Sequence, residues 1–349
     1  MEIKIGRRTI GGDNRVFIIA ELSANHRGDY GVAKRTIRAM KDAGADAVKF
    51  QTYTPDTITL NCDARHFRIK HGTLWDGKTF YKLYKEAMTP WSWQPKLKKY
   101  AEAIGLICFS SPFDKSSVDF LEKMRVPAYK IASFEITDIP LIEYVASKGK
   151  PVIISTGIAA LQDIREALRA CRRMGNNQVS LLKCTSAYPA PFDEANLRTI
   201  PDIARRFKVV AGLSDHTSGI SLPVAAVALG ARIIEKHFIL DRKLGGPDAA
   251  FSLEPQEFAD MSAAIRDVEA ALGGVNYNLS PKMLKNRIFS RSLFTVRGIS
   301  AGECFTEDNI RSIRPGLGLP PKHLKTIIGK KARINLKRGT PLALRHVSK

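Results

Sequence analysis

The stretch VVAGLSDHTSGISLPVAAVALGARIIEKHF, residues 209–238, contains the unit from which the fold is predicted. Two short β-prone runs, Val209–Leu213 and Arg232–His237, enclose the helix-like segment Ile220–Leu229. Gly230 stands where that helix would end, a position that favours a left-handed glycine. Because a helical crossover returns the chain in the same direction, the two strands are predicted to be parallel.

The same strand–helix unit recurs towards the N-terminus. Six more strands are predicted, at Val16–Ala20, Ala47–Gln51, Leu106–Ser110, Ala128–Ile131, Val152–Ser155 and Val179–Cys184. Amphipathic segments between them include Tyr30–Ala43, Trp91–Ile104 and Leu161–Met174. Eight units in about 260 residues predict a closed (β/α)8 TIM barrel, an α/β fold, rather than an open doubly wound sheet. No GxGxxG follows the first strand, which also disfavours a dinucleotide-binding fold.

Segments outside the repeat define the remaining organisation. IKIGRRTIGGDNRVFI, residues 3–18, predicts a β-hairpin that closes the barrel bottom, and the insertion Thr52–Met88 predicts a lid-like loop over the top. The pattern ends at Leu272. We therefore expect a barrel domain at 1–272, a Gly/Asn/Ser/Pro linker at 273–289 and a small, β-prone C-terminal domain at 290–349.

The composition restricts the class of protein. With 349 residues, 44% hydrophobic and 26% charged, the chain is neither collagen-like, low-complexity nor a small disulfide scaffold. It contains no apolar stretch long enough to cross a membrane and no signal-peptide core, so we expect a cytoplasmic protein. Five cysteines, an odd number without CxxC spacing, argue against a disulfide framework, and Cys108 and Cys184 are predicted to be buried.

The formal charge of +21 is concentrated at the C-terminal end. Residues 281–349 contain 16 Lys and Arg against 3 Asp and Glu, which is 16 − 3 = +13. One interpretation is a nucleic-acid or polyanion binder acting through this region. Its charges are dispersed and it has almost no aromatic residues for base stacking. A solvated basic face, or a lobe that attracts acidic metabolites, is therefore favoured.

Polar residues stand at the carboxyl ends of all eight predicted strands, where TIM-barrel enzymes hold their catalytic groups. In chain order they include Glu21, Lys49, Gln51, Ser111, Lys130, Ser133, Glu135, Ser155, Lys183, Ser186, Tyr188, Ser214, His216, Glu235 and His237. A buried charge is costly unless it is paired or bound to a ligand. Lys49 and Lys130 therefore predict a bound anion, a small phosphate or carboxylate.

His216 and His237 end adjacent predicted strands and suggest a metal site, with Glu21 and Asp248 as nearby carboxylates. Two imidazoles with open positions suit Mn, Fe, Co or Zn, and such a metal could polarise an aldehyde oxygen. The other histidines outside the first loop are expected on the surface: His66, His71, His323 and His346.

These motifs together resemble the sialic acid synthase family. The matching stretches are IIAELSANH at 18–26, VKFQTY at 48–53, SSPFD at 110–114, YKIAS at 129–133, STG at 155–157, KCTSAYP at 183–189, GLSDHT at 212–217 and IEKHF at 234–238. The terminal AGE…RPGLGL…IIGKKA…GTPL resembles the family's antifreeze-like (SAF) domain. Within the family, the insertion is similar to that of the pseudaminic acid synthases rather than the N-acetylneuraminate enzymes.

The resemblance implies condensation of phosphoenolpyruvate (PEP) with the open-chain aldehyde of an N-acylated amino sugar, with release of phosphate. It also implies a divalent metal, usually Mn or Mg, and a domain-swapped homodimer. For pseudaminic acid synthases the sugar is 2,4-diacetamido-2,4,6-trideoxy-L-altrose. LGGPDAAFSLEP at 244–255 keeps a neuraminate-like GPD, so N-acetylneuraminate or legionaminate synthase stays as an alternative.

The resemblance also implies roles for individual residues. The PEP carboxylate and phosphate would contact Lys49, Lys130, Ser111, Ser133, Ser155, Ser186 and Ser214, although the neuraminate enzymes have asparagine at the position of Ser186. The metal would be bound by His216 and His237. The sugar or the reacting centre would contact Glu21, Gln51, Tyr188 and Asp248, and Glu135 would lie near the water-activating region. Arg314 would enter the active site of the partner subunit and contact the N-acyl group.

Two other enzyme classes compete with this interpretation. A 3-deoxy-sugar-phosphate synthase would need a second basic cluster for a sugar phosphate, and none is evident at the predicted strand ends. A Schiff-base aldolase would use Lys130 or Lys183 as a covalent nucleophile.

Overall fold

The computed structural model describes residues 1–70 and 72–348. The chain forms two compact units, Met1–Gly273 and a second unit from Gly274 onward, which are described separately. Within the described ranges, no helix is both long enough and apolar enough to cross a membrane.

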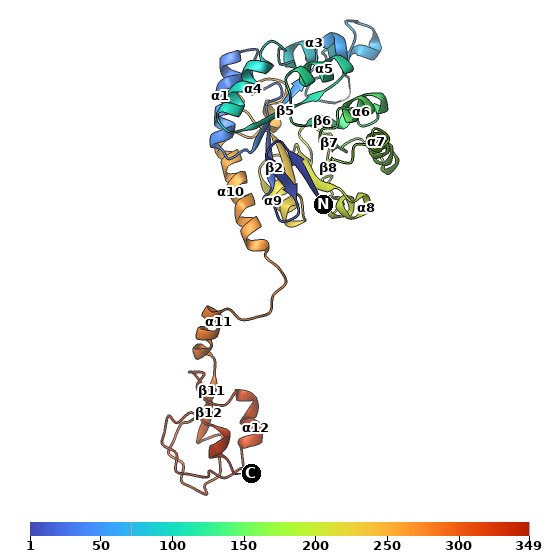
Figure 1. The fold of residues 1–349 in the computed structure, drawn as a ribbon. Coiled ribbons are helices and arrows are strands. Elements are labelled where there is room, and N and C mark those ends of the chain that lie inside the picture. Colours follow the sequence, from blue (N-terminus) through green and yellow to red (C-terminus); the bar gives the residue numbers. More distant parts are fainter. Residues whose placement is uncertain (71, 349) are drawn as a thin grey trace. The chain divides into compact units, whose positions relative to one another are not determined.

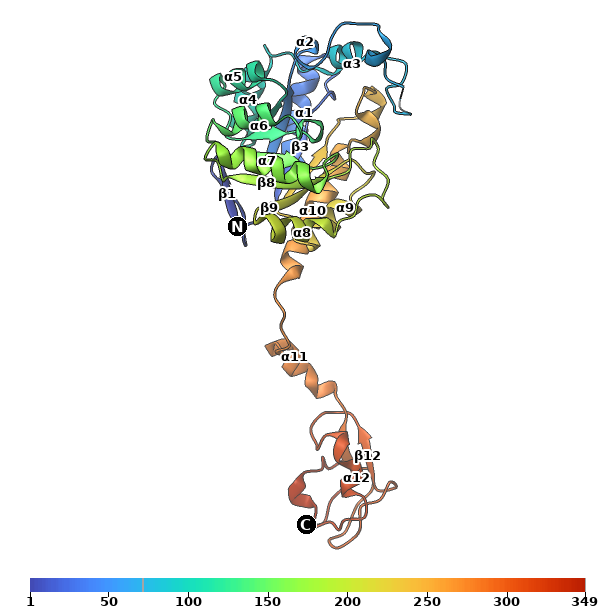
Figure 2. The same ribbon diagram turned by 90° about the vertical axis from the view of Figure 1, so that its right-hand side faces the viewer.

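The first unit is a closed barrel of eight parallel strands (Figures 1 and 2), which confirms the predicted fold. In chain order the strands are β3 (Phe17–Glu21), β4 (Ala47–Thr52), β5 (Ile107–Pro112), β6 (Tyr129–Ile131), β7 (Val152–Ser155), β8 (Val179–Cys184), β9 (Val210–Asp215) and β10 (Ile233–His237), and β10 pairs with β3 to close the ring. The surrounding helices are α1 (Tyr30–Asp42), α4 (Gln94–Ala103), α5 (Lys115–Lys123), α6 (Ile139–Ala146), α7 (Leu161–Arg173), α8 (Thr199–Phe207), α9 (Ser221–Ala228) and α10 (Pro255–Leu272).

Helix α1 illustrates how local sequence sets these limits. It begins after Asp29, whose carboxylate accepts a hydrogen bond from the backbone N–H of Val32. Such a cap contributes typically about 1 kcal/mol. The helix ends before Gly44, which has a φ of 89°, a conformation that favours glycine. A Cβ at this position would also lie only 3.1 Å from Cβ of Ser262.

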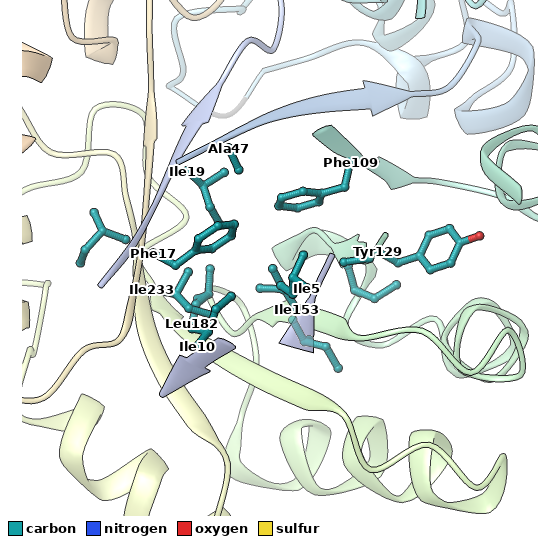
Figure 3. Packing of buried hydrophobic residues seen from close by; sticks show 14 of the residues in the cluster. Ile5, Ile10, Phe17, Ile19, Ala47, Phe109, Tyr129, Ile153, Leu182 and Ile233 are labelled. Atoms are coloured by element: carbon teal, nitrogen blue, oxygen red, sulfur yellow. The ribbon is translucent and has the colours of Figure 1, made fainter. Parts of the chain in front are cut away.

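The predicted N-terminal hairpin is confirmed. Strands β1 (Glu2–Ile5) and β2 (Arg8–Gly11) pair in antiparallel register. Ile5 and Ile10 are fully buried and belong to the same apolar core as the barrel residues Phe17 and Leu182 (Figure 3). The hairpin therefore covers one end of the barrel, and the chemistry is left to the other end.

The insertion between β4 and α4 contains α2 (Pro55–Ile58), η1 (Arg65–Phe67) and α3 (Phe80–Ala87). It folds towards the β10–α10 connection, which contains η3 (Arg242–Leu244) and η4 (Ala249–Phe251). The Trp75 indole N–H donates a 3.0 Å hydrogen bond to the carbonyl of Pro247. The insertion thus covers the carboxyl-end side of the barrel, as predicted.

The second unit has its own small core, formed by residues such as Leu293, Phe305 and Leu336. Its elements are α11 (Pro281–Asn286), η5 (Arg287–Phe289), the antiparallel pair β11 (Ser292–Thr295) and β12 (Ile310–Ile313), η6 (Pro321–His323), α12 (Leu324–Ile327) and η7 (Leu344–His346). Helix α11 lies within residues 273–289, which we keep as the proposed linker. The surface prediction for His346 was wrong, since this residue is only 6% exposed. His71 lies outside the described residues.

Candidate active site

A buried cluster of two lysines and two glutamates occupies the carboxyl end of the barrel. Lys130 on β6 donates to both carboxylate oxygens of Glu235 on β10, at 2.7 and 2.9 Å. Lys49 on β4 lies 3.4 Å from Oε1 of Glu235 and forms a second ion pair with Glu21 on β3. All four residues are less than 5% exposed. The barrel thus brings four charges from four strands into one network.

Burial and ion pairing shift the pKa values of these groups in opposite directions. Burial raises the pKa of Glu235, but the two lysines outweigh it and hold that pKa at about 2. Burial lowers the pKa of Lys130 more than Glu235 raises it. For Lys49, the two carboxylates outweigh burial and the pKa is raised. The carboxylate of Glu235 therefore remains ionised and holds both ammonium groups.

This cluster corrects one expectation. Lys49 and Lys130 were expected to need an external anion, but Glu21 and Glu235 supply compensating charge within the protein. Glu235 was noted as a strand-end residue without a role. Because side chains alternate along a strand, Glu235 must face the same side as His237, two residues later. That alternation is the signal by which the sequence could have placed Glu235 in the site.

Two of the predicted serines contact the lysine–glutamate cluster directly. Lys49 Nζ donates to Ser111 Oγ at 3.4 Å, and Ser214 Oγ donates to Glu235 at 3.2 Å. Ser133 and Ser186 share a 2.6 Å hydrogen bond between their hydroxyls. The hydroxyl of Ser155 is buried and has no hydrogen-bond partner in the described part of the chain. The hydroxyls therefore come from the carboxyl ends of five different strands, β5 to β9, or from the residues that follow them.

Gly157 is a further residue of this region whose role the sequence did not indicate. A Cβ at this position would lie 2.0 Å from Ser186 Oγ and 3.1 Å from Cys184 Sγ. Real Cβ atoms do not approach another atom so closely. The absence of a side chain at 157 therefore leaves the space that the Ser133–Ser186 pair occupies.

His216 and His237 follow the adjacent strands β9 and β10, and their ring centroids are 5.3 Å apart. His216 Nδ1 donates to the carbonyl of Thr185 at 3.1 Å, so its Nε2 carries the free lone pair. His237 Nδ1 is buried without a hydrogen-bond partner among residues 1–70 and 72–348, and it lies 3.7 Å from Oδ2 of Asp248. Burial lowers both pKa values, that of His216 to about 4, so both imidazoles are neutral at pH 7.

These features fit a divalent cation. A neutral imidazole is the form that binds metal. The buried Nδ1 of His237, which lies beside the carboxylate of Asp248 and has no hydrogen-bond partner in the described part of the chain, is therefore free to coordinate a cation. The described residues do not form a group of three or more closely arranged His, Cys, Asp or Glu side chains. His216 and His237, with Asp248 beside His237, are the residues that could hold such a cation.

A cavity of about 540 Å³ opens beside His237. Its polar lining includes Gln51, Asp248, Glu135, Ser133 and Tyr188, all of them predicted site residues. Burial raises the pKa of Glu135 to about 7, and its Oε2 has no partner within the described ranges. The cavity therefore holds a carboxyl group that changes charge near neutral pH.

Ser23 connects three of the polar groups, although no role was predicted for it from the sequence. Gln51 Nε2 donates to Ser23 Oγ at 2.9 Å, Ser23 Oγ donates to Asp248, and the Ser23 N–H donates to Glu21 at 3.0 Å. Ser23 has a φ of 44°, which is uncommon for a residue with a side chain. Tyr188 completes this side of the cavity, with its ring 4.5 Å from that of His216.

Other predicted residues lie elsewhere. Arg314 is exposed and directly follows β12 in the second unit, so its predicted role in a partner's active site stays a prediction. Lys183 donates to the carbonyl of Cys184 at 2.7 Å and is partly buried. Cys108 and Cys184 are buried free thiols, as predicted.

The fold and this site define a TIM-barrel enzyme whose buried lysines and hydroxyls can hold a small anion beside a cavity for a second reactant. The NeuB family model matches residues 36–277, and the SAF domain model matches residues 290–348. The chain belongs to the NeuB family, which confirms the resemblance to the sialic acid synthases.

Individual relatives narrow this placement. The chain is similar to a pseudaminic acid synthase of Campylobacter jejuni, with 47% identity over 95% of this chain and 96% of the relative. An N,N'-diacetyllegionaminic acid synthase of Legionella pneumophila is 36% identical over 98% and 97%. The crystal structure of an N-acetylneuraminic acid synthetase from Leptospira borgpetersenii in complex with citrate superposes with a TM-score of 0.73. That structure is 33% identical over 82% of this chain and 95% of its own.

Proposed function

We propose that the chain is a pseudaminic acid synthase, which condenses PEP with 2,4-diacetamido-2,4,6-trideoxy-L-altrose and releases phosphate. The similarity to a pseudaminic acid synthase along almost the whole chain supports this substrate pair over those of the legionaminate and neuraminate enzymes. The observation that carries the proposal is the lysine cluster, which lies next to a cavity large enough for a second small reactant.

PEP occupies the lysine end of the site. Lys49 and Lys130, with the hydroxyls of Ser111, Ser133, Ser155, Ser186 and Ser214, bind its phosphate and carboxylate through charge-assisted hydrogen bonds. Ser155 supports this assignment because its buried hydroxyl lacks a partner within the described chain. PEP would provide that partner.

The sugar lies in the cavity with its aldehyde towards His237 and Asp248. A divalent cation such as Mn or Mg, held by His216 and His237, would polarise the aldehyde oxygen. Gln51 and Tyr188 line the same end and can hydrogen-bond to the acyl-amino and hydroxyl groups. PEP and the sugar are thereby held side by side, so that their positioning contributes to the rate.

The chemical steps follow from this placement. The methylene carbon of PEP attacks the aldehyde carbon, the aldehyde oxygen takes a proton from water and becomes a hydroxyl, and positive charge develops at carbon 2 of PEP. The carboxylate of Glu21, held by Lys49, or that of Glu135 stabilises this charge. Water then adds to carbon 2 as Glu135 accepts its proton. The tetrahedral intermediate collapses to the 2-keto acid as its hydroxyl loses its proton to solvent and the bond between carbon 2 and the phosphate oxygen breaks, which releases phosphate.

We further propose a cytoplasmic, domain-swapped homodimer in which Arg314 of one subunit contacts the N-acyl group bound by its partner. Arg314→Ala should lose activity towards the sugar, and so should Lys130→Ala. Mixing the two variants should restore part of the activity, because one mixed site then carries both intact residues. Verified mixed dimers without activity would show that each subunit uses its own Arg314.

The proposed reaction is tested directly with the purified full chain, PEP, Mn²⁺ and a panel of N-acylated amino sugars that includes N-acetylmannosamine. Phosphate release and product mass are measured. We expect the highest kcat/KM with 2,4-diacetamido-2,4,6-trideoxy-L-altrose and a product of the mass of pseudaminic acid. Preferred use of another sugar would refute this substrate assignment, and borohydride trapping of pyruvate on Lys130 or Lys183 would indicate a Schiff-base aldolase instead.

A further inference from the structure

The acceptor cavity has two chemically different ends. Its carboxylates and its imidazole are carried by the barrel and its loops, as in Glu135, His237 and Asp248. The insertion between β4 and α4 provides a wall that combines the hydroxyls of Tyr53, Thr73 and Tyr84 with apolar side chains. Its purely aliphatic or phenyl side chains on this wall are Ile58, Ile69, Phe80, Leu83 and Ala87. Phe113, after β5, extends that wall.

Packing within the insertion holds the apolar side chains of this wall in place. Ile69 and Leu83 are 3% and 6% exposed, so their side chains are held within the folded insertion. Phe80 stacks on Tyr84, and Tyr53 packs edge-on against both Tyr84 and Phe113. Aromatic pairs of this kind fix ring positions as well as burying area. The wall therefore presents a defined apolar surface to whatever occupies the cavity.

The two ends orient an open-chain sugar. The reacting aldehyde must lie at the polar end, near His237 and the lysine cluster, because the partner reactant is bound there. The end of the carbon chain farthest from the aldehyde then points away from these groups, towards the insertion. A terminal hydroxyl or phosphate placed against Ile58 and Leu83 would lose its water without gaining a hydrogen-bond partner from them.

We propose that the wall formed by Ile58, Ile69, Phe80, Leu83, Ala87 and Phe113 selects acceptors whose terminal carbon is a methyl group. This inference rests on the proposed function and assigns the choice between a 6-deoxy and a 6-hydroxy sugar to the insertion. A hydrophobic pocket discriminates against an added hydroxyl by a factor on the order of 10 to 100. The insertion is thus a specificity element and more than a lid.

The test compares two acceptors that differ in a single oxygen, 2,4-diacetamido-2,4,6-trideoxy-L-altrose and its 6-hydroxy analogue, with PEP and Mn²⁺. The full-length enzyme should favour the 6-deoxy sugar by at least about tenfold in kcat/KM. Ile58→Thr places a hydroxyl on the wall and should reduce this ratio several-fold, mainly through KM of the 6-deoxy sugar. Ile58→Val keeps the wall apolar and should preserve the ratio. Leu60→Thr is the matched control, because Leu60 is 59% exposed and does not line the cavity.

The outcomes separate the inference from the proposed function. Equal use of both sugars by the unsubstituted enzyme, or an equal effect of Ile58→Thr on both, would overturn the inference and leave the proposed function intact. Preferred turnover of N-acetylmannosamine, which has a hydroxylated end, would overturn both. If no sugar is turned over, the proposed function fails. Calorimetric binding of the two sugars to PEP-loaded protein then still decides whether the wall prefers the methyl group.

Discussion

Replacing Glu235 by glutamine removes the carboxylate that both buried lysines share, while keeping the size of the side chain. Lys130 Nζ lies 2.7 and 2.9 Å from its two oxygens, and Lys49 Nζ lies 3.4 Å from one of them. At about 2.8 Å, two unit charges attract each other by about 6 kcal/mol at an effective dielectric constant of 20. Removing one partner of a buried pair costs about 3 to 5 kcal/mol, because the other charge stays buried without compensation. We expect Glu235→Gln to lower the free energy of unfolding of the barrel by that amount.

Thermal unfolding of the full chain, followed by circular dichroism, measures the effect. For a domain of this size, about 1 kcal/mol corresponds to about 2 °C, so the barrel transition should fall by roughly 6 to 10 °C. Glu143→Gln is the matched control. Glu143 accepts a 2.7 Å hydrogen bond from Arg173, but both side chains are partly exposed, so the loss of this pair should cost less than about 1 kcal/mol.

Adding PEP to the same experiment tests whether its charge binds at Lys130. A ligand that binds only the folded state raises stability by mass action. The anionic groups of PEP replace the charge that Glu235→Gln removes, so PEP should raise the Tm of this variant more than that of the unsubstituted protein. An unchanged Tm would refute the calculated cost of the broken pair. Equal stabilisation of both proteins by PEP would refute the placement of its charge at Lys130.

Three further predictions concern neighbouring parts of the site. Gly157→Ala should raise KM for PEP about tenfold, because the added methyl displaces Ser186, whose hydrogen bonds are worth about 1 kcal/mol or more. Gly274→Ala is the control, since its Cβ meets nothing within 4 Å. An unchanged KM in Gly157→Ala would show that Ser186 does not contact PEP. His237→Ala should abolish phosphate release while calorimetry still detects PEP binding, whereas full activity after EDTA treatment would contradict a metal role. Burial raises the pKa of Glu135 to about 7, and a base must be ionised, so kcat/KM should rise with pH through about 7. Glu135→Gln should lose this rise, and its persistence in the residual activity would assign it to another group.

The sequence predicted the barrel well because hydrophobic periodicity and helix-ending glycines are local signals. Strands β7 (Val152–Ser155) and β8 (Val179–Cys184) have the limits that the apolar runs indicated. The charges of the site were less predictable, because their energies depend on contacts between distant segments. Lys130 and Glu235 are 105 positions apart, and no local pattern indicates that they pair. The need for glycine at position 157 depends on the distance from its Cα to Ser186, and only the folded chain defines that distance.

The lysine cluster also explains why neutral histidines belong beside it. Two lysines paired with Glu21 and Glu235 carry no net charge, so an enol phosphate that binds there adds its negative charges to a neutral, buried site. Such an addition is unfavourable in a medium of low dielectric constant unless further positive charge is available. Lys49 and Lys130 cannot supply it alone, because each already faces a carboxylate. The imidazoles of His216 and His237 add no charge of their own at pH 7, since burial lowers both pKa values. They can instead hold a divalent cation, whose two positive charges would offset those of PEP. On the proposed function, PEP and the cation should therefore bind cooperatively, and omission of Mn²⁺ should weaken PEP binding in the unsubstituted protein more than in Glu235→Gln.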